Sequence, residues 1–231
     1  MRPYLVRKLL FLWLFFPIMA SCGEAFLSLE ELFGITNRQV LEAEITNLEA
    51  AGGTLDKAER LKRLGIVWHN LSVLKVSGAS KQADKWLKKA LDITPADHEV
   101  MAYYGSARTM VARDSWNVLT KMSVANKGIA LIEKAIRKAP DNVAVRMVRA
   151  NNSLALPGFF DRRSKARLDF SLLHGRLDKL DLSHDVKAEI CFKLGQILEE
   201  DGDQGRARFL YEQARTLSPD GQWAQRASEQ L

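Results

Sequence analysis

The sequence predicts an all-α fold: an α-α superhelix of about four irregular helix-turn-helix repeats, between an N-terminal helix and a C-terminal capping helix. Two observations support this prediction. Apolar residues recur at helical spacing along most of the chain, and no segment alternates apolar and polar residues over the length of a strand. In addition, the spacing of small and large residues in residues 191–219 recurs three times earlier in the chain, each time less perfectly.

The first 21 residues are typical of an export signal. Arg7 and Lys8 precede an apolar run at residues 9–19, which is shorter than a membrane-spanning helix needs. Cys22 follows two small residues, and this pattern resembles the lipobox of bacterial lipoproteins, in which the cysteine becomes the lipidated first residue. Gly23 stands where an Asp would mark inner-membrane retention, so the resemblance implies the outer membrane. Two alternatives stay open: ordinary signal-peptidase cleavage a few residues later, and an uncleaved anchor.

The charge of the chain gives little support to nucleic-acid binding. The formal net charge is +6, but Arg2, Arg7 and Lys8 lie in the predicted signal, and without them 31 basic residues face 28 acidic ones. So small an excess favours neither DNA nor RNA as a partner. Besides Cys22 the chain has a single cysteine, Cys191, on the apolar side of a predicted helix, which indicates core packing rather than a disulfide.

A junction at residues 22–36 is predicted to lead into the helical domain, which spans 37–231. Ser28, with Glu31 three residues later, has the pattern of a capping box and predicts one short helix in the junction. Asn37 is a good helix cap, and the apolar spacing after it predicts a helix to about residue 51.

The four repeats are placed by the register of the last one. Small residues are expected where two helices cross closely, large residues fill the space between them, and a proline ends the unit. The register predicts repeats at about 57–95, 97–140, 141–178 and 183–219, followed by a closing helix at 222–231. The packing positions of this pattern are Leu64, Gly65, Trp68, Ala83, Ala90, Pro95, Gly105, Ala135, Pro140, Leu194, Gly195, Ala207, Tyr211, Ala214 and Pro219.

Two irregular segments interrupt the pattern. About eleven extra residues stand around Trp116 between the half-motifs of the second repeat, and we expect them to form an inserted loop. The third repeat has Arg149 at the crossing, no closing proline, and the adjacent Phe159 and Phe160 after a Pro-Gly break. Trp116, Phe159 and Phe160 are therefore candidate partner contacts, and the alternative is that they fill gaps in irregular packing.

The register resembles the tetratricopeptide repeat, a helix-turn-helix unit of about 34 residues. The resemblance covers about residues 57–231. It implies that the first helix of each repeat lines a concave groove that holds a partner protein or peptide. The groove positions carried over to this chain are Lys62, His69, Tyr103, Ser106, Thr109, Asn151, Gln196 and Glu199. The alternative is that these are simply solvated polar positions.

Sequence motifs of catalysis, metal binding and cofactor binding are missing from the chain. None of its four histidines has a ligand-type partner at the spacing of a metal site, and no phosphate-cradling or nucleophile motif is present. The acidic stretch at 201–205 lacks the closing glutamate of a calcium loop and is expected to be a turn. We therefore expect no catalytic residue, no metal and no cofactor. Basic residues on the second helices could also favour anionic lipid headgroups.

The function indicated is a non-enzymatic scaffold for protein–protein interaction in the bacterial cell envelope. The expected location is the periplasm, with a lipid anchor in the outer membrane, and a soluble periplasmic or secreted protein is the alternative. One alternative function is an assembly factor for an outer-membrane, secretion or pilus complex. Others are an envelope enzyme or cell-wall-binding protein with an unrecognised site, and a structural protein that oligomerises through its terminal helices.

Overall fold

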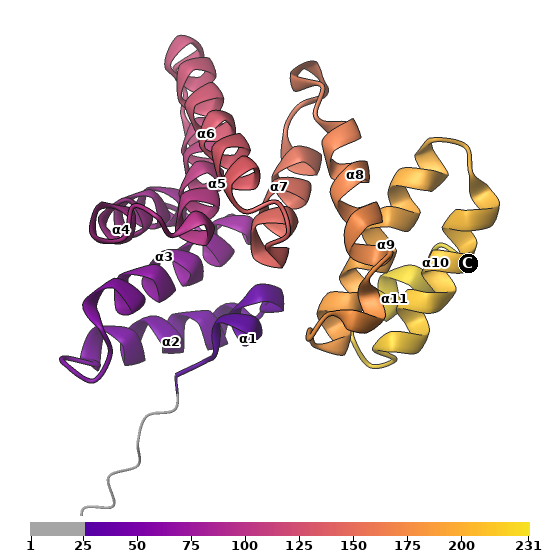
Figure 1. Cartoon of the computed structure of the whole chain (residues 1–231), viewed down its shortest axis with the longest axis horizontal. Coiled ribbons are helices and arrows are strands. Elements are labelled where there is room, and N and C mark those ends of the chain that lie inside the picture. The colour runs from indigo at the N-terminus through magenta and orange to yellow at the C-terminus, as the bar shows by residue number, and fades with distance from the viewer. Residues whose placement is uncertain (1–25) are drawn as a thin grey trace, which may run out of the picture.

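The computed structural model describes residues 26–231, apart from the side chains of residues 118 and 119. The predicted signal at 1–21 and the suspected lipidation at Cys22 lie outside this part. The described chain is all-helical, as the sequence predicts (Figure 1). Its helices are α1 (Leu29–Gly34), α2 (Arg38–Ala50), α3 (Lys57–Val73), α4 (Ala79–Ile93), α5 (His98–Asp114), α6 (Val118–Lys138), α7 (Val143–Ala155), α8 (Arg163–His174), α9 (His184–Glu200), α10 (Gln204–Leu217) and α11 (Gln222–Ser228), with 3-10 turns η1 (Gly158–Phe160) and η2 (Leu177–Lys179).

Short polar side chains fix where the first helix of each repeat begins. Asp56, Asp97, Asn142 and Ser183 stand just before α3, α5, α7 and α9, and each accepts a hydrogen bond from one or two backbone N–H groups of the first turn. These groups have no partner inside the helix, so such a cap typically stabilises the helix by about 1 kcal/mol. The four helix pairs α3–α4, α5–α6, α7–α8 and α9–α10 follow from these starts.

Glycines allow the two helices of a pair to cross closely. A methyl group on Gly105 of α5 would lie 2.6 Å from the carbonyl oxygen of Gly128 in α6. A methyl group on Gly195 of α9 would lie 2.7 Å from the ring of Tyr211 in α10, and one on Gly65 of α3 would lie 2.5 Å from Leu87 in α4. Real Cβ atoms do not approach other atoms this closely, so these crossings require glycine.

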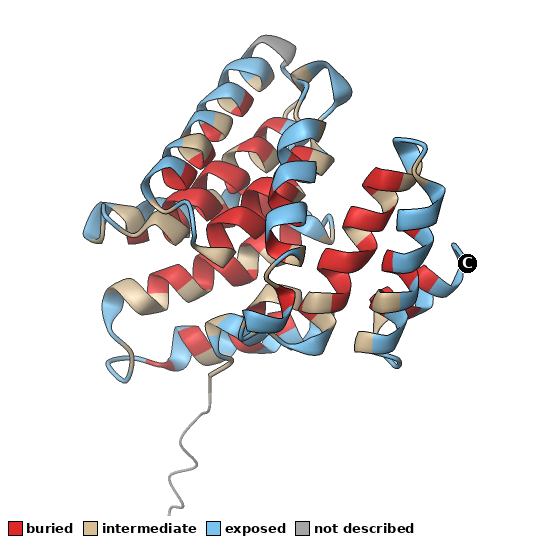
Figure 2. Ribbon diagram, turned by 45° about the vertical axis from the view of Figure 1, so that its right-hand side comes forward, coloured by how far each residue is buried: buried red, intermediate tan, exposed pale blue. Residues whose placement is uncertain are grey.

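The buried side chains form two clusters that meet at α7. Val145 and Val148 of α7 belong to the cluster of the first two repeats, whereas Met147 and Ala150 of the same helix belong to the cluster of the last repeats. Figure 2 shows the buried residues on the faces where the helices contact one another, with the exposed residues on the outer faces. Helix α7 is therefore common to both halves of the core.

The second repeat corrects one expectation. The extra residues around Trp116 do not form an inserted loop, because α5 continues to Asp114 and α6 begins at Val118. The side chain of Asn117 caps α6 by accepting from the backbone N–H of Thr120, and the helix then runs for 21 residues. The additional residues therefore lengthen the helix pair, and Trp116 lies in the short connection at its end with 91% of its surface exposed.

Buried ion pairs join the two helices of the third repeat, beside the apolar contacts of residues such as Ala150, Ala166 and Phe170. The carboxylate of Asp169 in α8 is fully buried and accepts from Arg149 at 2.7 and 2.9 Å and from Arg146 at 2.7 Å, both in α7. Arg149 also binds Glu133 of α6 at 3.1 Å. This network explains why the repeat departs from the apolar pattern of the others.

Helix α1 connects the first repeat to the last. The side chain of Asn70 in α3 donates to the carbonyl of Leu32 at 2.6 Å, which fixes α1 on the first repeat. At the other end of α1, Phe33 packs on the second cluster, and Gly34 lies against Val186 of α9. Figure 1 shows α1 between α2 and the lower end of α9. The superhelix is thus bridged across its ends.

Within residues 26–231, none of the helices has the length and the apolar character that crossing a membrane would need.

Candidate functional site: a concave cleft

A cleft of about 1110 Å³ lies on the side formed by the first helices of the repeats. Helices α3, α5, α7 and α9 all contribute to its wall, and the beginning of α6 and the turn η1 form part of its edge. The end of α1 and helix α11 also line it. The cleft therefore runs past all four repeats and is bounded by both terminal helices.

Six of the eight groove residues expected from the sequence line this cleft. Lys62 and Glu199 lie outside it. The six lining residues are His69, Tyr103, Ser106, Thr109, Asn151 and Gln196. Phe159 and Phe160 also line the cleft, with their ring centroids 4.6 Å apart, and Phe159 keeps 70% of its surface exposed. Trp116 does not reach the cleft lining. The structure thus brings six of the predicted groove residues and both phenylalanines together around one cleft.

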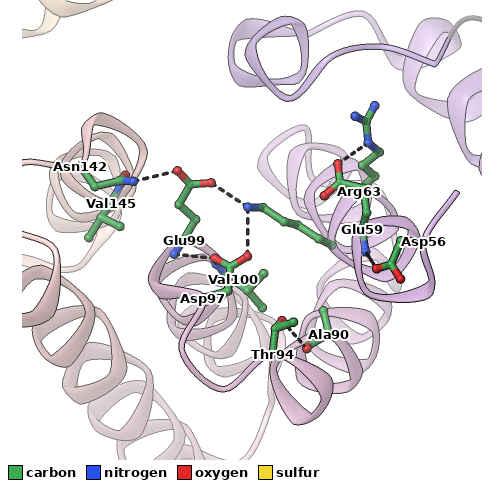
Figure 3. Close-up of polar contacts among 11 residues, drawn as sticks. Asp56, Glu59, Arg63, Ala90, Thr94, Asp97, Glu99, Val100, Asn142 and Val145 are labelled. Carbon is green, nitrogen blue, oxygen red and sulfur yellow. Dashed lines mark hydrogen bonds and ion pairs between the residues drawn. The ribbon is translucent and has the colours of Figure 1, made fainter.

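Lys62 joins the repeats to one another. Its ammonium group contacts Asp97 at 3.1 Å and Glu99 at 2.8 Å, and Glu99 also accepts from Asn142 at 2.8 Å (Figure 3). Burial by itself lowers the pKa of Lys62, but the two carboxylates hold it above its ordinary value. This chain of contacts links α3, α5 and the start of α7. Glu199, in turn, accepts from the hydroxyl of Tyr211 at 2.7 Å.

A ladder of uncharged polar groups crosses the floor of the cleft. His69 of α3 shares a hydrogen bond of 2.9 Å with the hydroxyl of Ser106 in α5. Asn152 of α7 donates to the hydroxyl of Thr109 at 2.6 Å, and that hydroxyl donates to the carbonyl of Ser106 at 2.7 Å. Burial lowers the pKa of His69 to about 4, so the ladder is neutral at pH 7. Asn152 was not among the residues expected from the sequence, and only its place beside Asn151 on the same helix indicates it.

The ladder contains one pair that has the geometry of a nucleophile and its base. The hydroxyl of Ser106 meets one ring nitrogen of His69, and the other ring nitrogen lies 3.4 Å from the side-chain oxygen of Asn70. A pKa of about 4 makes His69 a weak base at neutral pH. Ser106 is 2% exposed, and its hydroxyl also lies 3.4 Å from the amide nitrogen of Asn152. The contacts of this pair join α3 to α5 and α7, so the pair holds neighbouring repeats together.

Helix α11 contributes an aromatic wall with basic neighbours. Trp223 lines the cleft, and Lys193 of α9 and Arg226 of α11 lie 5.1 and 4.9 Å from its ring centroid. Lys193 also binds Glu189 at 2.7 Å. The sequence predicted a closing helix here but gave no indication that it faces the cleft.

The part of the chain at 26–231 contains no group of three or more His, Cys, Asp or Glu side chains that could hold a metal ion. Cys191 is buried in the second cluster, and burial raises its pKa to about 12, so its thiol is not ionised at neutral pH.

Comparisons with known proteins agree with the geometry. The family model described as tetratricopeptide repeat matches residues 188–220. The crystal structure of a thermophilic TPR protein from Thermus thermophilus is similar, with a TM-score of 0.63 and 16% sequence identity over 82% of this chain and 90% of that one. A search among curated proteins found no match.

The chain thus contains a tetratricopeptide repeat and has the fold of a tetratricopeptide repeat protein, which confirms the predicted superhelix. Repeats of this kind generally mediate contacts between proteins and are not catalytic.

Proposed function

We propose that this protein is a scaffold that holds a segment of a partner protein in the concave cleft. The observation that carries the proposal is the cleft itself, which all four repeats, α1 and α11 line together. A volume of about 1110 Å³ is enough for several side chains of a bound segment.

The lining favours a segment with apolar side chains. Aromatic residues from α1, α5, η1, α9 and α11 line the cleft, and Phe159 of η1 offers most of the exposed ring surface at 70%, since Phe192 and Trp223 are buried in the second cluster. Such rings bury a large area and are common at the centres of protein interfaces. Gln196 of α9 lines the cleft and is partly exposed, so its amide group can hydrogen-bond to the backbone of the bound segment, whereas the ladder groups are buried and already paired with one another.

Replacement of Ala155 by Trp should block the cleft. Ala155 is exposed and lines the cleft on α7, so a large side chain there occupies the space of a ligand without disturbing the core. A photo-crosslinking amino acid at position 155 identifies the partner segment, which is then made as a peptide. We expect the peptide to bind Ala155→Trp at least about tenfold more weakly than the native protein.

The matched control is Ala50→Trp, at the exposed end of α2 and outside the cleft. This variant should bind the peptide like the native protein. Equal affinity of the peptide for Ala155→Trp and the native protein, or equal crosslinking from positions 50 and 155, would exclude the cleft as the binding site.

We also propose that the protein works at the periplasmic face of the outer membrane, anchored by a lipid on Cys22. The support is the order of basic residues, apolar run, small residues and cysteine in the first 22 residues. The repeats would then hold the partner close to the membrane surface.

Replacement of Cys22 by Ala tests the anchor. We expect the variant to lose incorporation of a labelled fatty acid and to leave the membrane fraction, because lipidation supplies the membrane affinity. Cys191→Ala serves as the control, since the Cys191 thiol is buried in the core. Unchanged acyl labelling and unchanged fractionation of Cys22→Ala would contradict the proposal.

A further inference from the structure

A second, shallow hollow that is open to solvent, with a volume of about 530 Å³, lies outside the concave cleft, between α5 and α6. Apolar groups, Ala130 and Leu131, form part of its lining. Three basic side chains, Arg108, Lys127 and Lys134, line it together with Tyr104, and we call this site the basic hollow. It shares no residue with the cleft proposed to hold the partner.

Arg108 is held in place but has few partners. Its Nη1 donates to the hydroxyl of Tyr104 at 2.9 Å, and its guanidinium carbon lies 5.6 Å from the centroid of that ring. The carboxylate of Asp84 lies 3.7 Å from Nη1, which is longer than a hydrogen bond. Among the described residues Arg108 makes no other hydrogen bond, and its buried Nε has no partner. Most of its five N–H donors are thus unused.

The two lysines add positive charge that the described residues do not neutralise. Lys127 and Lys134 are seven residues apart on α6, so they lie on one face, about 10 Å apart along the helix. Neither has a carboxylate within ion-pair distance in the described part of the chain. Within residues 26–231, Asp84 is the one carboxylate in contact with the cations of the hollow, so three positive charges face one negative charge there.

We propose that the basic hollow binds a phosphate group. A phosphate presents acceptor oxygens in several directions, which suits the fork of Arg108, the hydroxyl of Tyr104 and a flexible lysine at the same time. A carboxylate is planar and carries a single charge, so it would leave more of these donors unused. The apolar lining at Ala130 and Leu131 accommodates the carbon part of the ligand next to the phosphate.

The phosphate group can belong to an anionic lipid headgroup or to a free phosphate compound, and two binding assays distinguish them. Inorganic phosphate is titrated at constant ionic strength, and flotation is compared between vesicles of phosphatidylglycerol and of phosphatidylcholine. A lipid anchor inserts into both kinds of vesicle, so only the difference between them reports on the hollow. We expect Arg108→Gln/Lys127→Gln to weaken phosphate binding at least about tenfold.

Two further variants make the result specific. Lys165→Gln/Arg215→Gln removes the same charge from exposed positions on α8 and α10 and should bind phosphate like the native protein. Lys134→Gln leaves the contact between Arg108 and Tyr104 intact, so weaker phosphate binding by this variant is not an effect of folding.

The assays separate four outcomes. A lipid headgroup is supported if the hollow variants lose the preference for phosphatidylglycerol vesicles and the control variant keeps it. A free phosphate compound is supported if the native protein binds inorganic phosphate but shows no preference between the two kinds of vesicle. The basic hollow is not a phosphate site if the hollow variants and the control variant bind inorganic phosphate and vesicles equally well. It is also excluded if the native protein binds neither of them.

Discussion

Replacement of Asp169 by Ala should unfold the third repeat at much lower denaturant concentration than the native protein tolerates. Asp169 is completely buried and accepts three hydrogen bonds from Arg146 and Arg149, which are themselves 8% and 5% exposed. Removal of the carboxylate leaves Arg146 without a counter-ion, and Arg149 with Glu133 alone, in a low-dielectric site. The cost of breaking such a buried pair is about 3 to 5 kcal/mol of unfolding free energy. Urea unfolding followed by circular dichroism measures this loss.

The control for Asp169→Ala is an ion pair on the surface. Asp141 contacts Arg176 at 3.2 Å, and its side chain is 83% exposed. Because water screens this pair, Asp141→Ala should change the unfolding free energy by about 1 kcal/mol or less. If Asp169→Ala were as mild as Asp141→Ala, the buried network would not be what holds α8 on α7.

Replacement of Gly105 by Ala should force α5 and α6 apart. The added methyl group would lie 2.6 Å from the carbonyl oxygen of Gly128 and 2.8 Å from the side chain of Ile132. A backbone oxygen cannot rotate away as a side chain can, so the whole helix has to move. Overpacking of this kind typically costs about 1 to 3 kcal/mol, and the thermal midpoint should fall correspondingly.

Gly205→Ala is the matched control for Gly105→Ala, because it makes the same chemical change in a helix. A methyl group at position 205 in α10 would have no atom of the described residues within 4 Å, apart from its chain neighbours and its own helix backbone. The variant should be neutral or should gain up to about 1 kcal/mol from the higher helix propensity of alanine. A similar thermal midpoint for the two variants would mean that the crossing of α5 and α6 tolerates a larger residue.

The sequence was sufficient to predict the architecture because local signals repeat along the chain. Caps such as Ser28 and Asn37 locate helix starts, and glycines such as Gly65 and Gly195 occur at helix crossings. The length of α6 was not predicted, because extra residues that lengthen a helix break the regular spacing of the repeat in the same way as an inserted loop does.

The cleft could be predicted only in part, for a related reason. Residues on the first helices, such as His69 and Ser106, follow from the register of the repeat. Contacts between distant parts of the chain do not, because no periodicity places Asp169 beside Arg149 or turns Trp223 toward α9. The same holds for Lys62, whose partners in the next repeat remove it from the cleft lining.

The bridge formed by α1 changes the mechanics of the repeat array. In an open array each repeat contacts only its neighbours, so the ends can move apart like those of a spring. Here Asn70 holds α1 on the first repeat while Gly34 rests against Val186 of the last, far away in the sequence. Helix α1 therefore links the first repeat to the last along the edge of the cleft. Widening the cleft for a bulky ligand would require α1 to detach from α9 or α7 to bend.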